Sequence, residues 1–166
     1  MKELIEKISS YNLFNYLFPG ILYVIILNKI TTYNMIQENI FIGAFLYYFI
    51  GLVISRVGSL LIEPILKKIA AFVNYSDFIS ASKEDVKIEL FSEVNNMYRT
   101  LISLFVLLIV SKLYNILSDN FNFLKLILPY LLVTSLMILF VFSFKKQTDY
   151  IVKRVNHHKE KNKSYE

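Results

Sequence analysis

The sequence predicts an all-α integral membrane protein with four transmembrane helices and a cytoplasmic helical extension between the second and third helices. Hydrophobic residues make up 55% of the 166 positions, charged residues only 19%, and the mean hydropathy is +0.49. A soluble domain of this length has too little interior for so much apolar side chain. The charges are also clustered, which leaves uncharged stretches of 21, 17, 12 and 19 residues. Such blocks match bilayer spans better than the faces of amphipathic helices.

The first hairpin, residues 1–62, contains two of the predicted spans. Residues 8–28 carry no charge, and their helical rise is enough to cross about 30 Å of hydrocarbon. The second span begins after Glu38 and crosses if Arg56 extends its guanidinium to the headgroup level. A cleaved signal peptide is the competing interpretation of the N-terminus. Acidic residues offset its two lysines and no small-residue cleavage site follows, so we expect a retained first helix.

The second hairpin, residues 100–144, contains the other two spans. The third covers residues 100–117 and includes Lys112 about one turn from its far end, where the side chain can extend to the interface. The fourth, residues 126–144, is uncharged and has Pro129 in its first turn, where a missing N–H costs least. Four spans place both termini on the same side of the membrane.

The distribution of Lys and Arg orients these spans. Cytoplasmic segments of bacterial membrane proteins are enriched in basic residues. If the termini and the central segment share one side, that side holds all basic residues except Lys29, Lys112 and Lys125, which lie at or near span ends. The sequence therefore predicts a multi-pass protein of the bacterial inner membrane with cytoplasmic N- and C-termini.

The central segment, residues 63–99, is expected to be largely helical. A proline ends or kinks the second helix, and apolar residues then recur at helical spacing over 65–73. That amphipathic helix either lies in the inner headgroup layer or packs on neighbouring helices. Residues 74–82 are turn-like, and Ser82 followed by Asp85 resembles a helix cap. Apolar residues then step by three or four into the third span, which predicts one continuous helix: Val86, Leu90, Val94, Met97 and Leu101.

The tail, residues 145–166, is basic. Retention on the cytoplasmic side together with attraction to anionic lipid is the favoured explanation, and RNA binding or docking to an acidic partner are alternatives. Direct nucleic-acid binding is not expected, because no folded nucleic-acid module fits in about twenty residues. His157 and His158 suggest a metal site or, with Arg154 and Asn156, a ribonuclease-like cluster. Adjacent histidines point in different directions on a helix, so a solvated tail is favoured.

Two sets of residues in the first hairpin are candidates for a role beyond spanning. Small residues step along the second helix and create a ridge on which helices can approach closely, within one subunit or between subunits: Gly43, Gly51, Ser55 and Ser59. The first span holds polar and helix-disfavouring residues that predict a kink or a late helix start: Asn12, Asn15, Tyr16, Pro19 and Gly20. They form either a turn into a shorter span or an irregular element lining a polar cavity or gate.

Arg56 and Glu63 are candidate inner-face charges. They lie seven residues apart on nearly the same helical face, but about 10 Å apart along the axis, so a direct pair is not obvious. They either mark the inner membrane boundary or form a functional charge relay, and the boundary role is favoured. The sequence shows no nucleophile elbow or general acid–base pair in a known context. We therefore expect no catalytic, cofactor-binding or metal-ligating residues and no enzymatic activity.

Three segments carry a resemblance to a class of known proteins. They are Asn-Tyr-Leu-Phe-Pro-Gly at residues 15–20, Gly-Leu-Val-Ile-Ser-Arg at 51–56 and Glu-Val-Asn-Asn-Met-Tyr-Arg at 93–99. Together they resemble small multi-pass membrane proteins of bacterial antiphage-defence loci. The resemblance covers most of the chain in layout and transfers no functional residue.

Two hypotheses of function follow. The first is a homo-oligomer that perturbs or gates membrane permeability as a defence effector or accessory, with residues 12, 15 and 16 lining its path. The second is a non-conducting membrane anchor or sensor that recruits a soluble nuclease or regulatory partner. The lipid bilayer is a partner in both.

Overall fold

The computed structural model describes residues 12–163, with side chains described for residues 12–159. Lys2 and Lys7, which contribute to the predicted orientation, lie outside these ranges. Throughout the described part the chain forms helices joined by loops. In chain order the elements are η1 (Leu13–Leu17), α3 (Phe18–Ile30), α4 (Ile40–Val57), η2 (Gly58–Ile62), α5 (Glu63–Leu66), α6 (Tyr75–Glu84), α7 (Val86–Asn120) and α8 (Asn122–Lys163).

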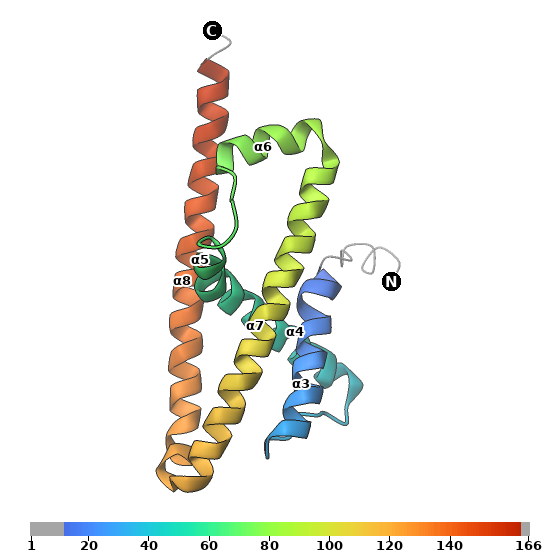
Figure 1. The fold of residues 1–166 in the computed structure, drawn as a ribbon, viewed down its shortest axis with the longest axis vertical. Coiled ribbons are helices and arrows are strands. Elements are labelled where there is room, and N and C mark those ends of the chain that lie inside the picture. Colours follow the sequence, from blue (N-terminus) through green and yellow to red (C-terminus); the bar gives the residue numbers. More distant parts are fainter. Residues whose placement is uncertain (1–11, 164–166) are drawn as a thin grey trace.

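Four helical stretches are long and apolar enough to cross a membrane, as predicted: Leu13–Ile30, Ile40–Leu66, Val86–Asn120 and Asn122–Lys159. In Figure 1, α3 and α4 cross beside α7, and α8 runs the full height of the molecule. The small apolar core lies where α3, α4 and α7 meet and consists of Leu27, Ile54, Leu104 and Leu108. Within the described part, no residue in the most apolar stretch of α8 is buried. The fourth long helix is therefore peripheral to the other three.

The first helix contains a wide π-helical turn where a kink or late start was expected at Pro19. The five residues of η1 precede Phe18, whose N–H bonds to the carbonyl of Leu13, five residues back. Proline has no N–H, and its ring collides with the carbonyl four residues before it in a regular α-helix. A wider turn ahead of the proline reduces this conflict while the helix continues.

The same arrangement recurs at the end of the second long helix. The five residues of η2 precede Glu63, whose N–H bonds to the carbonyl of Gly58, and Pro64 follows at once. Helix continues only to Leu66. The expected amphipathic helix over residues 65–73 is therefore wrong, because most of that segment consists of turns and extended chain.

The extended chain after α5 leads to α6, which corrects a second expectation. Residues 74–82 were predicted as a turn, yet α6 begins at Tyr75. The ring of Tyr75 lies 5.5 Å from that of Tyr150, which places the start of α6 against α8. An extended chain covers more than twice the distance per residue of a helix. The loop between α5 and α6 can therefore run alongside α8 and connect the two helices (Figure 1).

The continuous helix expected to enter the third span is confirmed as α7. Asp85 caps its first turn by accepting a hydrogen bond from the N–H of Lys87 at 2.9 Å. Near the other end, Lys112 donates to the carbonyl of Ile30, the last residue of α3, at 2.6 Å. This contact satisfies a carbonyl that the helix end leaves without an intrahelical partner.

A polar and charged centre between the helices

A small polar cluster joins the first three long helices. Thr100 Oγ1, on α7, lies 2.9 Å from Asn15 Oδ1 on η1 and 2.8 Å from the carbonyl oxygen of Asn96. A hydroxyl has one proton and donates it to one of these acceptors at a time. Asn15 Nδ2 lies 3.5 Å from Ser55 Oγ on α4. We call Asn15, Ser55 and Thr100 the polar core, and all three are buried.

Glycines at the crossing of the first two helices bring the polar core together. A Cβ atom on Gly20 would overlap the carbonyl oxygen of Tyr47, and one on Gly51 would overlap the carbonyl oxygen of Tyr16. The two backbones thus touch at two points, each requiring a residue without a side chain. Ser55 lies one turn beyond Gly51, at a depth where the short side chain of Asn15 reaches it.

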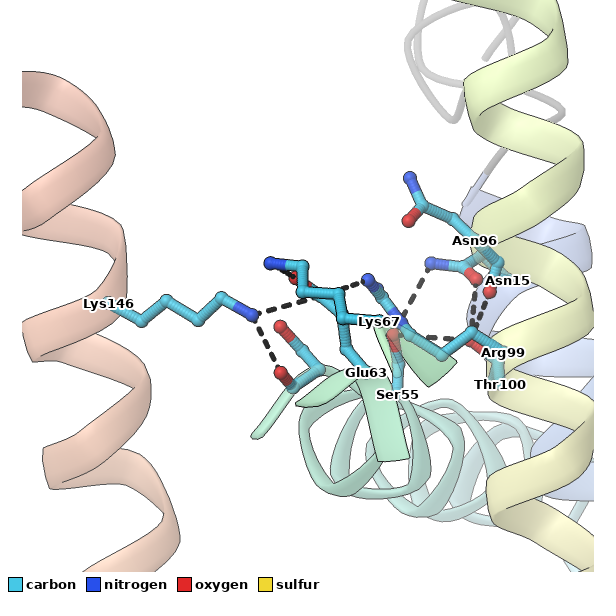
Figure 2. A network of polar contacts seen from close by, with 9 residues as sticks. Asn15, Ser55, Glu63, Lys67, Asn96, Arg99, Thr100 and Lys146 are labelled. Atoms are coloured by element: carbon cyan, nitrogen blue, oxygen red, sulfur yellow. Dashed lines mark hydrogen bonds and ion pairs between the residues drawn. The ribbon is translucent and has the colours of Figure 1, made fainter. Parts of the chain in front are cut away.

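A charged cluster adjoins the polar core and centres on Glu63. Glu63 Oε2 accepts from Arg99 Nη1 at 2.7 Å and from Lys146 Nζ at 3.0 Å, and Glu63 Oε1 lies 2.9 Å from Lys67 Nζ. The carboxylate is 8% exposed, Arg99 is 16%, Lys146 is 25% and Lys67 is 48%. Figure 2 shows Lys146 reaching across from α8 toward Glu63 and the residues of α7. One carboxylate therefore ties α8 and α7 to the end of the second long helix.

The π-helical turn η2 adds a second attachment for Lys146. In that turn the N–H of Glu63 bonds to Gly58, so the next donor, at position 64, would serve the carbonyl of Ser59. Position 64 is a proline and has no N–H. Lys146 Nζ donates to the Ser59 carbonyl instead, at 2.6 Å. Because Pro64 has no N–H, the Ser59 carbonyl is left free to accept from Lys146 and helps to hold α8 in place.

The candidate pore or gate residues differ in how far the contacts between the helices bury them. Asn15, Pro19 and Gly20 are buried within the chain, and Asn12 is partly exposed. Tyr16 packs edge-on against the ring of Tyr48, 5.5 Å away. The glycine of the first span therefore serves the crossing with α4, and the proline beside it is buried.

The ridge of small residues predicted on the second helix is used within the chain at several points. Gly51 contacts η1, Ser55 belongs to the polar core, and Ser59 contacts α8 through its carbonyl. Gly43 faces atoms of Tyr47 and Gln37 at ordinary or slightly tight separations.

Of the two candidate inner-face charges, Glu63 forms the charged cluster, while Arg56 lines a small pocket beside it. The partners of Glu63 were not predicted, because Arg99 and Lys146 had been counted only as basic residues. Thr100 was regarded only as the start of an apolar stretch. A polar residue at the edge of a span is the one signal that would have pointed to it.

The arrangement is suited to holding helices together and to presenting positive charge. Arg99 Nε is buried and makes no hydrogen bond within the described residues, so the charged cluster keeps a donor in excess. Over the same residues, no group of three or more His, Cys, Asp or Glu side chains could hold a metal ion. The rings of His157 and His158 lie 6.2 Å apart on the distal part of α8.

The fold and this centre define a class: an all-helical protein with four helices of membrane-crossing length, joined by a polar core and a charged cluster. Comparison of the chain with protein-family models, curated proteins and solved structures gives no match.

Proposed function

We propose that this chain is a bacterial inner-membrane anchor whose cytoplasmic part recruits a soluble protein. The charged cluster marks the level at which the long helices leave the bilayer, with the termini on the cytoplasmic side. Basic residues concentrate on that side, as expected for cytoplasmic segments. Beyond this level lie α6, the first turns of α7 and the last turns of α8, and we call them the helical frame (Figure 1).

The observation that carries the proposal is the apolar surface of the frame. Val86 is 77% exposed and Phe91 is 63% exposed, and Leu90 is exposed beside them. A shallow pocket on this side of α7 is lined by Val86, Leu90 and charged neighbours. Large apolar side chains that face water in a cluster are typical of protein-binding surfaces. If the resemblance to membrane proteins of antiphage-defence loci holds, the recruited protein is a soluble nuclease or a regulator.

Site-specific photo-crosslinking in living cells tests this proposal. A photoreactive amino acid at position 90 is expected to crosslink one soluble protein, identified by mass spectrometry. The matched control places the same amino acid at Phe121, an exposed apolar residue at the far end of the long helices. Crosslinking of the same soluble protein from position 121, or of lipid alone from position 90, would refute recruitment through the frame.

A second candidate function is a homo-oligomer that perturbs or gates permeability. The observation favouring it is the peripheral position of α8, whose apolar stretch is open to packing against other copies and carries exposed Thr134 and Ser135. Liposome flux measurements on the oligomer test it, together with the detergent-corrected mass of the particle. If conduction occurs and replacing Asn12 and Asn15 by Leu leaves it unchanged, those residues do not line the path.

A further inference from the structure

A small pocket lies beside the charged cluster, between the end of the second long helix and α8. Three residues at the end of the second long helix line one side, and four residues of α8 line the other: Arg56, Ser59 and Leu60, and Ser143, Lys146, Gln147 and Tyr150. The cavity itself is small, about 20 Å³, so a ligand larger than a water molecule has to lie at its opening. The lining comprises two cations, two serines, an amide, a phenol and one leucine, with no carboxylate among the described lining residues.

Among the described residues, the cations at and beside this pocket outnumber the carboxylates. Three cationic side chains contact one carboxylate, Lys67, Arg99 and Lys146 on Glu63, and Arg56 adds a fourth cation at the pocket. Clustering cations in a partly buried place costs free energy unless anions are close to them. The excess positive charge makes the pocket attractive to an anion.

The hydrogen-bond donors at the pocket point to the same conclusion. Lys146 uses two of its three N–H donors on Ser59 and Glu63. Arg56 is partly buried, and its guanidinium makes no hydrogen bond or ion pair with any residue that the structure describes. A guanidinium offers five N–H donors in a planar fork, which matches the oxygens of a phosphate group. Arg56 is therefore placed to bind an oxyanion that the described residues do not supply.

The position of the pocket along the helices indicates where such an anion comes from. Lys146 follows the long apolar stretch of α8 by one residue, and Arg56 ends the uncharged stretch of α4. Just before the pocket on α8, Phe140 packs on Phe49 of α4 with ring centroids 6.2 Å apart. Apolar rings on one side and cations on the other match the boundary between acyl chains and headgroups, given the membrane placement proposed above.

We propose that this pocket binds a phosphate group, with Arg56 and Lys146 as its ligands. The phosphate belongs to an anionic phospholipid of the cytoplasmic leaflet or to a free phosphate ion, and both present the same oxyanion. Binding neutralises part of the excess charge around Glu63 and ties α8 more firmly to the second long helix.

The test measures binding of two probes to the purified full-length protein. Native mass spectrometry counts phosphatidylglycerol bound per chain, with phosphatidylcholine as the reference lipid, and thermal melting is recorded with and without inorganic phosphate. We expect Arg56→Gln to weaken phosphatidylglycerol binding about tenfold, because a charge-assisted contact is lost. Lys68→Gln removes an exposed positive charge nearby, away from the pocket, and is expected to leave binding unchanged.

A second pair of variants keeps the proposal testable if Arg56→Gln does not fold. Gln147 is exposed at the pocket, so Gln147→Glu adds a repelling carboxylate with little effect on folding, and Thr148→Glu is its exposed neighbour outside the lining. If Arg56→Gln and Gln147→Glu lose phosphatidylglycerol binding while their two control variants keep it, a lipid phosphate is supported. Loss of stabilisation by inorganic phosphate in those variants, without a change in lipid binding, supports a free ion. If each variant matches its control with both probes, the proposal is overturned, and partner recruitment by the frame is unaffected.

Discussion

Removal of the charge of Glu63 is the most direct perturbation of this molecule. Glu63→Gln keeps the shape of the side chain and leaves three cations without their anion. Arg99 and Lys146 contact the same oxygen, so their nitrogens lie no more than about 6 Å apart. At an effective dielectric constant of about 20, their repulsion at that separation is about 3 kcal/mol.

The size of the effect follows from how far the ion pairs are buried. Loss of one partner from a fully buried pair costs about 3–5 kcal/mol, and the partial exposure of Arg99 and Lys146 favours the lower end of that range. A loss of about 3 kcal/mol changes the ratio of docked to undocked α8 by roughly a hundredfold. Lys67 is 48% exposed, so Lys67→Gln is expected to cost less than about 1 kcal/mol.

Spin-label distance measurements can detect the undocking of α8. The chain has no cysteine, so labels attach only at introduced sites, for example at exposed Phe91 on α7 and exposed Val155 on α8. We expect a narrow distance distribution in the parent and in Lys67→Gln, and a broad one in Glu63→Gln. An unchanged distribution and melting temperature in Glu63→Gln would refute the assignment of α8 docking to this carboxylate.

Three further predictions concern packing, the polar core and topology. Gly51→Ala is expected to cost about 3 kcal/mol in thermal or denaturant unfolding because the new methyl group meets a backbone carbonyl, whereas Gly43→Ala, which meets side-chain atoms, costs under about 1 kcal/mol. Thr100→Val is expected to cost about 1–3 kcal/mol in the same assay, while Thr134→Val on the exposed face of α8 is neutral, and equal losses would contradict the polar core. A cysteine at position 120 is expected to react with an impermeant thiol reagent in intact spheroplasts, and protection there would overturn the proposed orientation.

The long helices could be predicted because hydropathy is a local property. Twenty consecutive apolar residues must be removed from water whatever their neighbours are, so the four stretches of membrane-crossing length follow from composition and charge spacing alone. The continuation of α7 before its apolar stretch follows in the same way from its periodic apolar residues. These are the parts of the fold that do not depend on which helix packs against which.

The candidate site could be predicted only in part, because its contacts join distant residues. Asn15 and Thr100 are 85 positions apart, and Glu63 and Lys146 are 83 apart, so no window of sequence contains either contact. The polar character of Asn15 and the charge of Glu63 marked them as candidates. Only the crossing of the helices shows that each of them is surrounded by partners from other segments.

The segment between α5 and α7 was mispredicted for a different reason. Its periodic apolar residues 65–73 favour a helix locally, and its Ser and Asp residues favour a turn at 74–82. The structure reverses both. The chain has to travel along α8 before α6 begins, and the ring of Tyr75 reaches Tyr150 at the end of that path. An extended connection meets this tertiary requirement at the expense of the local preference for a helix.

The two π-helical turns connect the sequence to the functional centre. Each consists of five residues followed by one residue and a proline: η1 before Pro19 and η2 before Pro64. A wide turn adds one residue to the helix and rotates everything before it relative to everything after it. In η1 this rotation accompanies the inward placement of Asn15. In η2 it leaves the Ser59 carbonyl available to Lys146.

Both prolines therefore have a physical role that neither a kink nor a helix end describes. In each case the missing N–H and the bulky ring favour a wide turn at the place where a polar side chain or carbonyl meets another helix. If this reasoning holds, Pro64→Ala, which restores a donor for the Ser59 carbonyl, weakens the attachment of Lys146 and broadens the same α7–α8 spin-label distance. The salt bridges of Glu63 remain in that variant, so the broadening is expected to be smaller than in Glu63→Gln. An equal or larger effect would show that the turn itself, rather than the carbonyl that it exposes, positions α8.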